Sequence, residues 1–277
     1  MNIRQLIDTA SQQLSQLSDS PRLDAEILLA HSLRKNRSWL MTWPENTPDE
    51  AQLQLFQQLL QQRLQGHPIA HLTGEREFWS LPLQVTADTL IPRPDTELMV
   101  EQILARYPAE PAIQLLDLGT GSGAISLALA HERPAWQITA SDRSEAALQV
   151  AQRNAEQLGL DIEFKHSDWF STLQGQLFDV IASNPPYIPR TDPHLSQGDV
   201  RFEPLSALAS GDDGLDAIRH ICATATDFLK PAGQLFIEHG YDQMTEIHDI
   251  LHRNHYHSIQ QYHDLAGSPR LTSGIFS

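Results

Sequence analysis

Apolar positions in the first quarter of the chain follow a helical period. A first helix is indicated by apolar side chains three and four residues apart, at Ile3, Leu6, Ile7, Ala10, Leu14 and Leu17. A second helix begins at Ser20-Pro21, because proline fits the first helical position. Thr47-Pro48-Asp49-Glu50 has the form of a capping box, and it opens a Gln- and Leu-rich helix that stops at Gly66. We therefore predict a small all-helical domain over residues 1–75.

The pattern changes after this domain. The stretch FWSLPLQV places aromatic and β-branched residues around a proline, so residues 76–92 are expected to form a hairpin linker. Beyond it, short apolar runs alternate with helical patterns. Candidate strands cover residues 112–117, 137–141, 162–166, 178–183 and 234–239. The tail adds two more, SIQQYHDLAG and RLTSGIFS, joined by a turn at Gly267-Ser268-Pro269.

Alternating strands and helices are typical of a parallel sheet covered by helices on both faces. We predict an α/β domain over residues 93–277, with a doubly wound, mostly parallel, seven-stranded sheet of Rossmann-like type. Ligands of such domains bind at the carboxyl ends of the strands, near the point where the strand order reverses. The residues that follow each strand are therefore the first place to look for chemistry.

Composition excludes several classes of protein. No apolar run approaches the roughly 18 residues that span a membrane, and the polar N-terminus lacks the apolar core of a signal peptide. We expect a cytoplasmic protein without a membrane partner. Cys222 is the single cysteine, so we expect no disulfide and no Cys-based zinc site. We expect Cys222 to be a small buried apolar residue on a helix. No exposed apolar seam is evident, which favours a monomer.

The charge balance weighs against nucleic acid as a partner. The net charge is −16, and the Lys and Arg residues form no cluster along the sequence. Proteins that bind DNA or long RNA usually carry a basic stripe that displaces counterions from phosphate. A protein or a small molecule fits this chain better.

Two groups of side chains raise the question of a metal. His252, His255 and His257 lie close together, but no HExxH or Cys/His spacing accompanies them. The acidic residues of 212–216 precede a predicted helix, where capping and the helix dipole explain them. We expect no metal site.

The first chemical signal is a glycine loop. A buried strand ends at Asp117 and leads through Gly119-Thr120-Gly121-Ser122-Gly123 into an apolar helix. Glycine allows a sharp turn and a close approach to a ligand, and the helix start offers free N–H groups. Asp142, after the next strand, is placed to bind both hydroxyls of a ribose. The series Gly119-x-Gly121-x-x-Ala124 also fits the dinucleotide fingerprint, so NAD remains an alternative here.

Two features favour S-adenosylmethionine as the cofactor. Asp117 stands two residues before the first glycine, where its carboxylate can orient the loop and reach the amino-acid end of the cofactor. Asp168-Trp169 follows the third strand, where the acid can bind the adenine amino group and the ring can stack on the base. If the chain were an NAD-dependent oxidoreductase, the motif at residues 184–187, described next, would have no function. The sequence also contains no evident Tyr-x-x-x-Lys proton donor.

The second signal is Asn184-Pro185-Pro186-Tyr187, directly after the fourth strand of the domain. The two prolines end regular structure and stiffen the residues around them. The side-chain oxygen of Asn184 and the carbonyl of Pro185 can accept both protons of one planar NH₂ group, with little entropy lost at reaction. Those bonds strengthen as the nitrogen attacks a methyl group, and Tyr187 can pack the planar group beside a cationic sulfonium. The motif indicates methyl transfer to an amide or an exocyclic amine, without a general base.

The chain resembles the class I S-adenosylmethionine-dependent methyltransferases, and more closely the release-factor glutamine methyltransferases. The motifs that carry the resemblance are IPRPDTE (91–97), DLGTGSGAI (117–125), SDWF (167–170), SNPPYI (183–188) and DVRFEPLSAL (199–208). The resemblance implies methyl transfer to the side-chain amide nitrogen, N5, of the glutamine in the Gly-Gly-Gln motif of class 1 peptide chain release factors. It also implies that residues 119–123, 142 and 169 contact the cofactor, and that residues 184–187 hold the substrate glutamine. We expect Asn184 to contact the cofactor as well.

The resemblance leaves several points open. The Asn-Pro-Pro-Tyr motif is shared with amino-methyltransferases that act on nucleic-acid bases, which is the alternative function. Arg93 and Glu97 are expected to shape the cofactor pocket or its lid, or else to form a plain ion pair near a helix start. Residues 188–212 form a long loop of the kind that often acts as a lid. Arg201 and Glu203 within it would contact the protein substrate or simply pair.

Overall fold

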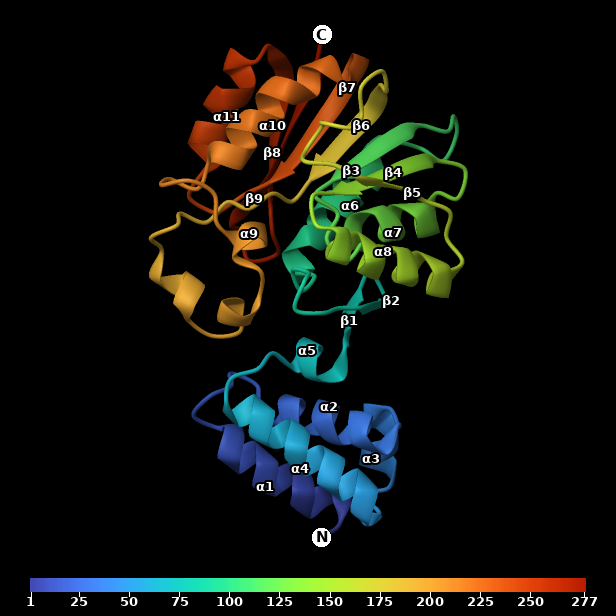
Figure 1. Ribbon diagram of the computed structural model, residues 1–277, viewed down its shortest axis with the longest axis vertical. Coiled ribbons are helices and arrows are strands. Elements are labelled where there is room, and N and C mark those ends of the chain that lie inside the picture. Colours follow the sequence, from blue (N-terminus) through green and yellow to red (C-terminus); the bar gives the residue numbers. More distant parts are fainter. The chain divides into compact units, whose positions relative to one another are not determined.

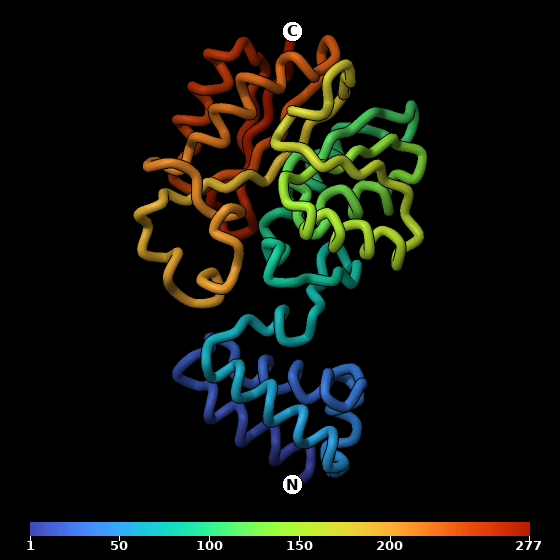
Figure 2. The backbone as a smooth tube through the Cα atoms, viewed as in Figure 1, coloured from blue at the N-terminus to red at the C-terminus, as the bar shows by residue number.

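The computed structural model describes residues 1–277, which form two compact units (Figures 1 and 2). The smaller unit contains Met1–Glu75 together with Gly198–Phe202. The larger unit contains Arg76–Gln197 and Glu203–Ser277. No helix in either unit combines the length and the apolar character needed to cross a membrane.

The N-terminal part is all-helical, as predicted (Figure 1). Its helices are α1 (Ile3–Leu14), α2 (Pro21–Leu33), α3 (Arg37–Thr42), α4 (Glu50–Leu64) and α5 (Ile69–Thr73). The apolar faces of α1, α2 and α4 meet in one core, in which Ile3, Leu28 and Phe56 are almost completely buried. The helical spacing of the apolar residues therefore identified the buried faces, except for Leu17, which lies beyond the end of α1 and is exposed. The short helices α3 and α5 were not predicted.

The start of α4 differs from the prediction by two residues. Asp49, and not Thr47, is the N-cap. The Asp49 carboxylate accepts a hydrogen bond from the Gln52 backbone N–H at 2.8 Å, and the Gln52 side chain accepts one from the Asp49 N–H at 3.0 Å. A carboxylate also interacts favourably with the positive end of the helix dipole. The capping box is therefore Asp-x-x-Gln, and Pro48 lies before the cap.

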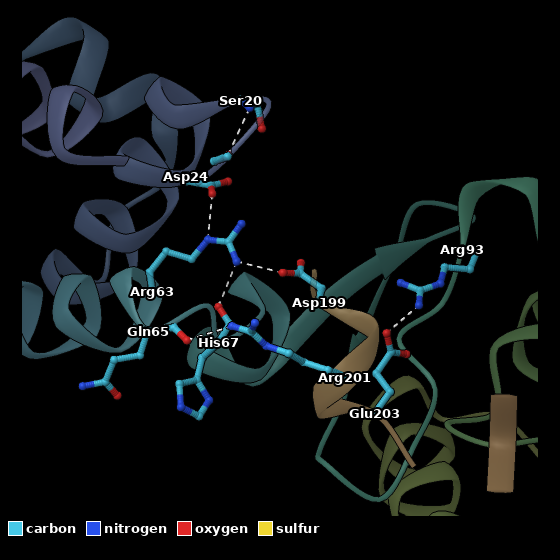
Figure 3. A network of polar contacts seen from close by, with 10 residues as sticks. Ser20, Asp24, Arg63, Gln65, His67, Arg93, Asp199, Arg201 and Glu203 are labelled. Carbon is cyan, nitrogen blue, oxygen red and sulfur yellow. Dashed lines mark hydrogen bonds and ion pairs between the residues drawn. The ribbon is translucent and has the colours of Figure 1, made fainter. Parts of the chain in front are cut away.

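A buried arginine organises the smaller unit (Figure 3). Arg63 on α4 donates from Nε to Asp24 at 2.9 Å and from Nη1 to Asp199 at 2.8 Å. Arg201 donates to the backbone carbonyl of Gln65 at 3.0 Å. These contacts explain why residues 198–202, far away in the sequence, belong with the N-terminal helices.

We expect Arg63→Ala to lower the free energy of unfolding of the helical unit by about 3–5 kcal/mol, because Asp24 would stay buried without its partner. Arg4→Ala is the matched control. It removes the solvent-exposed Arg4–Glu45 pair and should cost less than about 1 kcal/mol. Urea unfolding followed by circular dichroism measures both variants. Equal costs for the two variants would contradict the assigned importance of the buried pair.

The larger unit is built on a seven-stranded sheet with the order β5-β4-β3-β6-β7-β9-β8 (Figure 1). The strands are β3 (Gln114–Leu118), β4 (Gln137–Asp142), β5 (Glu163–His166), β6 (Phe178–Ser183), β7 (Leu229–Glu238), β8 (Tyr256–His263) and β9 (Pro269–Phe276). The pairs among β3 to β7 are parallel, and β9 runs antiparallel to both of its neighbours. This confirms the predicted doubly wound, mostly parallel sheet.

Helices cover both faces of the sheet. The helices α6 (Glu97–Arg106), α7 (Ala124–Glu132) and α8 (Glu145–Leu158) lie on one face, and α10 (Asp216–Thr224) and α11 (Met244–Arg253) lie on the other. Alternate residues of β3 supply the two cores: Leu115 packs in the first, Leu116 and Leu118 in the second. Cys222 is buried in the second core, on α10, as expected.

Two further pieces complete the larger unit. The strands β1 (Glu75–Phe78) and β2 (Leu81–Gln84) form the expected hairpin, whose turn residues Trp79 and Ser80 both have positive φ. The predicted turn between the last two strands is also present. Its shape is set by Asp264, whose carboxylate accepts a hydrogen bond from the Ser268 N–H at 2.9 Å.

The remaining short elements lie in the loops. They are the 3₁₀ turns η1 (Pro94–Thr96), η2 (Pro193–Ser196), η3 (Val200–Phe202) and η4 (Ala225–Asp227), and the single-turn helix α9 (Leu205–Leu208).

The strand order reverses at β3, which pairs with β4 on one side and with β6 on the other. The crevice outside the carboxyl ends of these strands is therefore the expected place for a ligand.

Candidate functional site

A cavity of about 960 Å³ lies at the carboxyl ends of β3, β4 and β6. Its walls include residues from four segments: 119–122, 141–144, 184–186 and 204–211. Every residue of its lining belongs to the larger unit. The volume suits a ligand of nucleotide size. The glycine loop and the Asn-Pro-Pro corner, predicted from separate parts of the sequence, thus face the same cavity.

The backbone of the glycine loop is held from behind by the end of β4. The N–H groups of Gly119 and Thr120 both donate to the Ser141 carbonyl, at 2.8 and 2.9 Å. The N–H of Gly121 donates to the Asp142 carboxylate at 2.9 Å. Gly119 and Gly121 have φ angles of +81° and +58°, and a side chain at either would extend into open space. The loop therefore leaves its backbone open to a ligand on the cavity side.

Asp117 supports the loop from below. It is fully buried, and its Oδ2 accepts hydrogen bonds from the Thr120 hydroxyl at 2.6 Å and from the Ser126 N–H at 3.1 Å. Burial raises the pKa of Asp117 to about 6, although these hydrogen bonds pull it down. Its Oδ1 has no hydrogen-bond partner in the chain. Asp117 therefore holds the loop through Thr120 and Ser126, and one of its oxygens has no partner. Its expected contact with the amino-acid end of the cofactor stays a prediction.

The third glycine has a packing function. Gly123 is not part of the cavity lining, and a Cβ atom there would lie 2.8 Å from the Leu127 side chain. Its φ of +89° is also unfavourable for other residues. Gly123 therefore lets α7 begin close against the loop. Whether it also contacts a cofactor stays a prediction.

Asp142 lies on the cavity wall, where a ribose was expected. Its two oxygens already accept backbone hydrogen bonds, Oδ2 from Gly121 and Oδ1 from Ser144 at 2.8 Å. A carboxylate has about four acceptor positions, so two remain for ligand hydroxyls. The backbone contacts fix the carboxylate before any ligand arrives.

The loop after β5 contributes an aromatic ring to the cavity. Ser167 and Trp169 line it, and the half-buried Trp169 ring lies 6.2 Å from the His220 ring, centre to centre. Asp168 is exposed and does not line the cavity. The proposed contact between Asp168 and an adenine amino group stays a prediction. His220 was not identified from the sequence, where nothing distinguishes it among the 13 histidines.

The Asn-Pro-Pro corner presents two free acceptors. Asn184, Pro185 and Pro186 line the cavity directly after β6. The Asn184 Nδ2 donates to the Thr96 hydroxyl at 3.1 Å, while no donor of the chain binds the Asn184 Oδ1 or the Pro185 carbonyl. The Ser183 hydroxyl ties the end of β6 to the Leu118 carbonyl at 2.7 Å. The corner is therefore anchored to β3, and its acceptors are available to a substrate.

Tyr187 lies behind this wall. It is absent from the cavity lining and packs against the second core. Its hydroxyl donates to Oε1 of Glu238 at 3.4 Å, and its carbonyl accepts from the Gln243 side chain at 2.9 Å. Burial raises the pKa of the phenol above its usual range. The expected contact of its ring with a planar substrate group stays a prediction.

Arg93 and Glu97 do not pair with each other. Arg93 lines the cavity and donates to Glu203, whose carboxylate also accepts from the Ile91 N–H at 2.9 Å (Figure 3). Glu97 instead accepts a hydrogen bond from the Trp79 N–H at 2.9 Å. The backbone explains this, because Arg93 is extended before a 3₁₀ turn and Glu97 already begins α6. Of the two expectations for Arg93, a place in the pocket agrees with the geometry.

The loop 188–212 is closed at its base. The Ile188 N–H donates to the Leu208 carbonyl and the Ser210 N–H to the Ile188 carbonyl, both at 2.9 Å. The Arg190 N–H donates to the Gly211 carbonyl at 3.0 Å. Residues after Glu203 form one wall of the cavity. Movement of this loop as a lid stays a prediction.

No group of three or more His, Cys, Asp or Glu side chains is arranged to hold a metal ion. Two of the acidic residues at the start of α10 have other partners. Asp213 and Asp216 both bind Arg219, and Asp213 also accepts a hydrogen bond from the Leu215 N–H at 3.1 Å.

Family models match both parts of the chain. The model described as the PrmC N-terminal domain matches residues 5–74, and the one described as the methyltransferase small domain matches residues 94–197. Curated relatives named release factor glutamine methyltransferase match almost the full length. The protein from Shewanella oneidensis is 49% identical over 98% of this chain and 95% of its own. The protein from Pseudomonas aeruginosa is 51% identical over 94% of this chain and 95% of its own. The protein from Vibrio cholerae is 48% identical over 100% of this chain and 97% of its own.

Solved structures agree on the fold of the larger unit. A methyltransferase from Pyrococcus furiosus is 18% identical, with a TM-score of 0.54 over 71% of this chain and 88% of its own. A 16S rRNA methyltransferase from T. thermophilus, solved with AdoMet and guanosine, is 19% identical, with a TM-score of 0.52 over 73% of this chain and 50% of its own. At these identities the likeness establishes the methyltransferase fold and no more.

Proposed function

The chain belongs to the release factor glutamine methyltransferase family, and we propose that it methylates N5 of the glutamine in the Gly-Gly-Gln motif of class 1 peptide chain release factors. The methyl donor in this proposal is S-adenosylmethionine. The observation that carries the proposal is the pair of free acceptors on the Asn-Pro-Pro corner, Asn184 Oδ1 and the Pro185 carbonyl, beside an open glycine loop. We further propose a cytoplasmic monomer.

The residues of the site fit this cofactor. Asp117, fully buried beneath the glycine loop and outside the cavity lining, has an oxygen without a partner, which suits the ammonium group at the amino-acid end. Asp142 is fixed on the wall with acceptor positions left for two ribose hydroxyls. Trp169 offers a ring face for the adenine. When bound, S-adenosylmethionine would supply an electrophilic methyl group on a sulfonium, and the neutral thioether left after the S–CH₃ bond breaks would be the leaving group.

The chain's own residues would act on the substrate amide by orientation. An amide NH₂ is planar, and its nitrogen attacks only when the lone pair points at the methyl group. Asn184 Oδ1 and the Pro185 carbonyl can each accept one of the two N–H protons and hold the group in that position. Both protons become more acidic as the N–C bond forms, so both hydrogen bonds strengthen in the transition state. The surplus proton leaves to water afterwards, and no general base is required.

The same two acceptors would also fit an exocyclic amine of a nucleic-acid base, the alternative function. The charge of the chain disfavours it. The net charge is −16, and a duplex or a long single strand needs compensating cations along its backbone. A protein substrate therefore fits better.

Label transfer separates the two functions. The purified protein is incubated with methyl-labelled S-adenosylmethionine and, in parallel, with a class 1 release factor, its Gly-Gly-Ala variant, and mixed RNA and DNA. We expect label on the intact release factor alone. Label on nucleic acid would support the alternative, and equal label on the Gly-Gly-Ala variant would move the modified position elsewhere in the factor.

A further inference from the structure

We propose that Gln243 is a positioning residue for methyl transfer, because its side chain fixes the end of the Asn-Pro-Pro-Tyr motif. This inference rests on the proposed function. Gln243 lies between β7 and α11, directly before the helix (Figure 1), and is 8% exposed. It does not line the cavity, so it would touch neither cofactor nor substrate. It acts through the backbone carbonyl of Tyr187.

Both ends of the Gln243 side-chain amide are held by backbone groups. The Gly240 N–H donates to Oε1 at 2.9 Å, and Nε2 donates to the Tyr187 carbonyl, also at 2.9 Å. A backbone N–H can only donate and a carbonyl can only accept, so one orientation of the amide satisfies both groups. The side chain therefore bridges the turn after β7 to the end of the Asn-Pro-Pro-Tyr motif.

A third segment packs directly against this bridge. A Cβ atom on Gly214, in the turn before α10, would collide with the Tyr187 carbonyl oxygen and would lie 2.8 Å from Gln243 Nε2. Only a residue without a side chain fits there. The hydrogen bond between Gln243 and Tyr187 is therefore enclosed, and the carbonyl has little room to turn away from it.

The Asn-Pro-Pro-Tyr motif is thus fixed at both ends. Before it, the Ser183 hydroxyl donates to the Leu118 carbonyl at 2.7 Å. At its end, the Tyr187 carbonyl is held by Gln243. Between these anchors, the two proline rings fix two φ angles, and each residue before a proline is restricted as well. Few torsions stay free, so the two anchors set the direction of the Pro185 carbonyl.

This direction matters for the reaction. The Pro185 carbonyl and the Asn184 Oδ1, which no donor of the chain binds, would accept the two protons of the substrate NH₂ group. Both must point at that group for the nitrogen lone pair to face the methyl group. A misplacement of about 1 Å can lower a rate about 100-fold. Gln243 would limit such a misplacement without contacting a reacting atom.

Gln243 also has a local structural role, which is distinct from positioning. Its N–H donates to the Gly240 carbonyl at 3.1 Å, while the Gly240 N–H donates to its side chain, and the two bonds close the turn that leads into α11. The structural role needs only an acceptor at Oε1. The link to Tyr187 needs a donor at Nε2. A carboxylate of the same shape keeps the first and loses the second.

Gln243→Glu separates the two roles in the full-length protein at pH 8. The ionised carboxylate still accepts from Gly240, but it has no proton for the Tyr187 carbonyl and repels its oxygen. We expect kcat for methylation of the release factor to fall about tenfold or more, because the substrate acceptors are no longer held in direction. The dissociation constant for S-adenosylmethionine should stay within about twofold.

Protonation should restore the lost donor. The O–H of a protonated carboxyl group can donate to the Tyr187 carbonyl, while its other oxygen accepts from Gly240. Gln243→Met is the matched control, because it fills a similar volume and cannot donate at any pH. We expect the kcat of Gln243→Glu relative to that of Gln243→Met to rise as the pH is lowered from 8 to about 5, since burial favours the protonated form of a carboxyl group.

The charged groups around Tyr187 and the turn before α11 are the same in both variants, so their own titration cancels in this ratio. They are Arg93, Asp213, Glu238, His239, Asp242 and Arg270.

A change in the third segment tests the same carbonyl with Gln243 intact. Gly214→Ala places a methyl group against the Tyr187 oxygen, and we expect the same loss of kcat, about tenfold or more, with unchanged cofactor affinity. Gly267→Ala is the matched control. The φ angles of the two glycines are +81° and +82°, but a Cβ atom on Gly267 would meet nothing within 4 Å. The control carries the same backbone strain without the collision and should keep the kcat of the unmodified protein.

Three results would overturn the inference. One is an unchanged kcat in Gln243→Glu at pH 8, or, should that variant fail to fold, a kcat of Gly214→Ala equal to that of Gly267→Ala. The second is a loss of kcat that accompanies an equal loss of cofactor affinity. The third is a ratio of Gln243→Glu to Gln243→Met that does not change with pH. An unmodified protein that methylates no release factor would refute the proposed function as well, whereas an active unmodified protein with any of the three results leaves that function standing.

Discussion

Asn184→Ala should lower kcat for methylation of a release factor about 10²–10³-fold, the usual effect of deleting one fixed dipole that acts on the transition state. The Asn184 Oδ1 has no partner within the chain and lies on the cavity wall, so its removal leaves the substrate amide with one acceptor instead of two. The dissociation constant for S-adenosylmethionine should change less than about tenfold, because the glycine loop and Asp142 remain in place.

Single-turnover methylation and isothermal titration measure these two quantities. Asn254→Ala is a suitable control, since Asn254 follows α11 and its side chain bonds only the Ile250 carbonyl at 2.8 Å. It should leave both quantities unchanged. A large loss of cofactor affinity in Asn184→Ala, with kcat preserved, would show that Asn184 acts on the cofactor and not on the substrate.

Asp142→Ala should raise the dissociation constant for S-adenosylmethionine about 100-fold. Two effects combine. The variant loses the charged acceptor for the ribose hydroxyls, and each hydrogen bond to a charged group contributes roughly 1.5–3 kcal/mol. It also releases the Gly121 N–H, which Asp142 binds at 2.9 Å, so the glycine loop is no longer held in its open form.

Isothermal titration of the apoprotein with S-adenosylmethionine is the direct measurement. Asp161→Ala provides the matched control, because Asp161 is an exposed carboxylate just before β5 and does not line the cavity. We expect wild-type affinity for the control. If Asp142→Ala bound the cofactor as tightly as the control, the ribose contact assigned to Asp142 would be wrong.

Much of the fold was predictable because local patterns and long-range packing agree in this chain. The strand 178–183 was predicted at its true limits, since it is a central strand in which every residue except Asp179 is buried. The strand at 234–239 was predicted too short. β7 begins at Leu229, but Lys230, Pro231 and Gly233 conceal its first half, and the pairing with β6 shifts register there. The strand propensity of these residues could not reveal the first half of β7, because its pairing with β6, far away in the sequence, stabilises it.

The site was predictable where a motif follows a strand end, and it was missed where partners are remote in sequence. Gly119, Gly121 and Asn184 could be placed at one cavity because parallel strands end at one edge. Nothing in the local sequence links Glu238 to the Asn-Pro-Pro-Tyr corner. Its contact with Tyr187 spans 51 positions, and the ion pair of Arg93 with Glu203 spans 110. Such pairs follow from the strand order and from loop closure, which a single sequence does not encode locally.

Tandem mass spectrometry of the methylated release factor tests the central claim most directly. A class 1 factor is incubated with the protein and S-adenosylmethionine, digested, and the peptide that contains Gly-Gly-Gln is fragmented. We predict a single added methyl group on the glutamine side chain, at its amide nitrogen, and none in a parallel reaction with Asn184→Ala. A methyl group on any other residue, or on the glutamine in equal amount with the variant, would contradict the account of how this cavity holds its substrate.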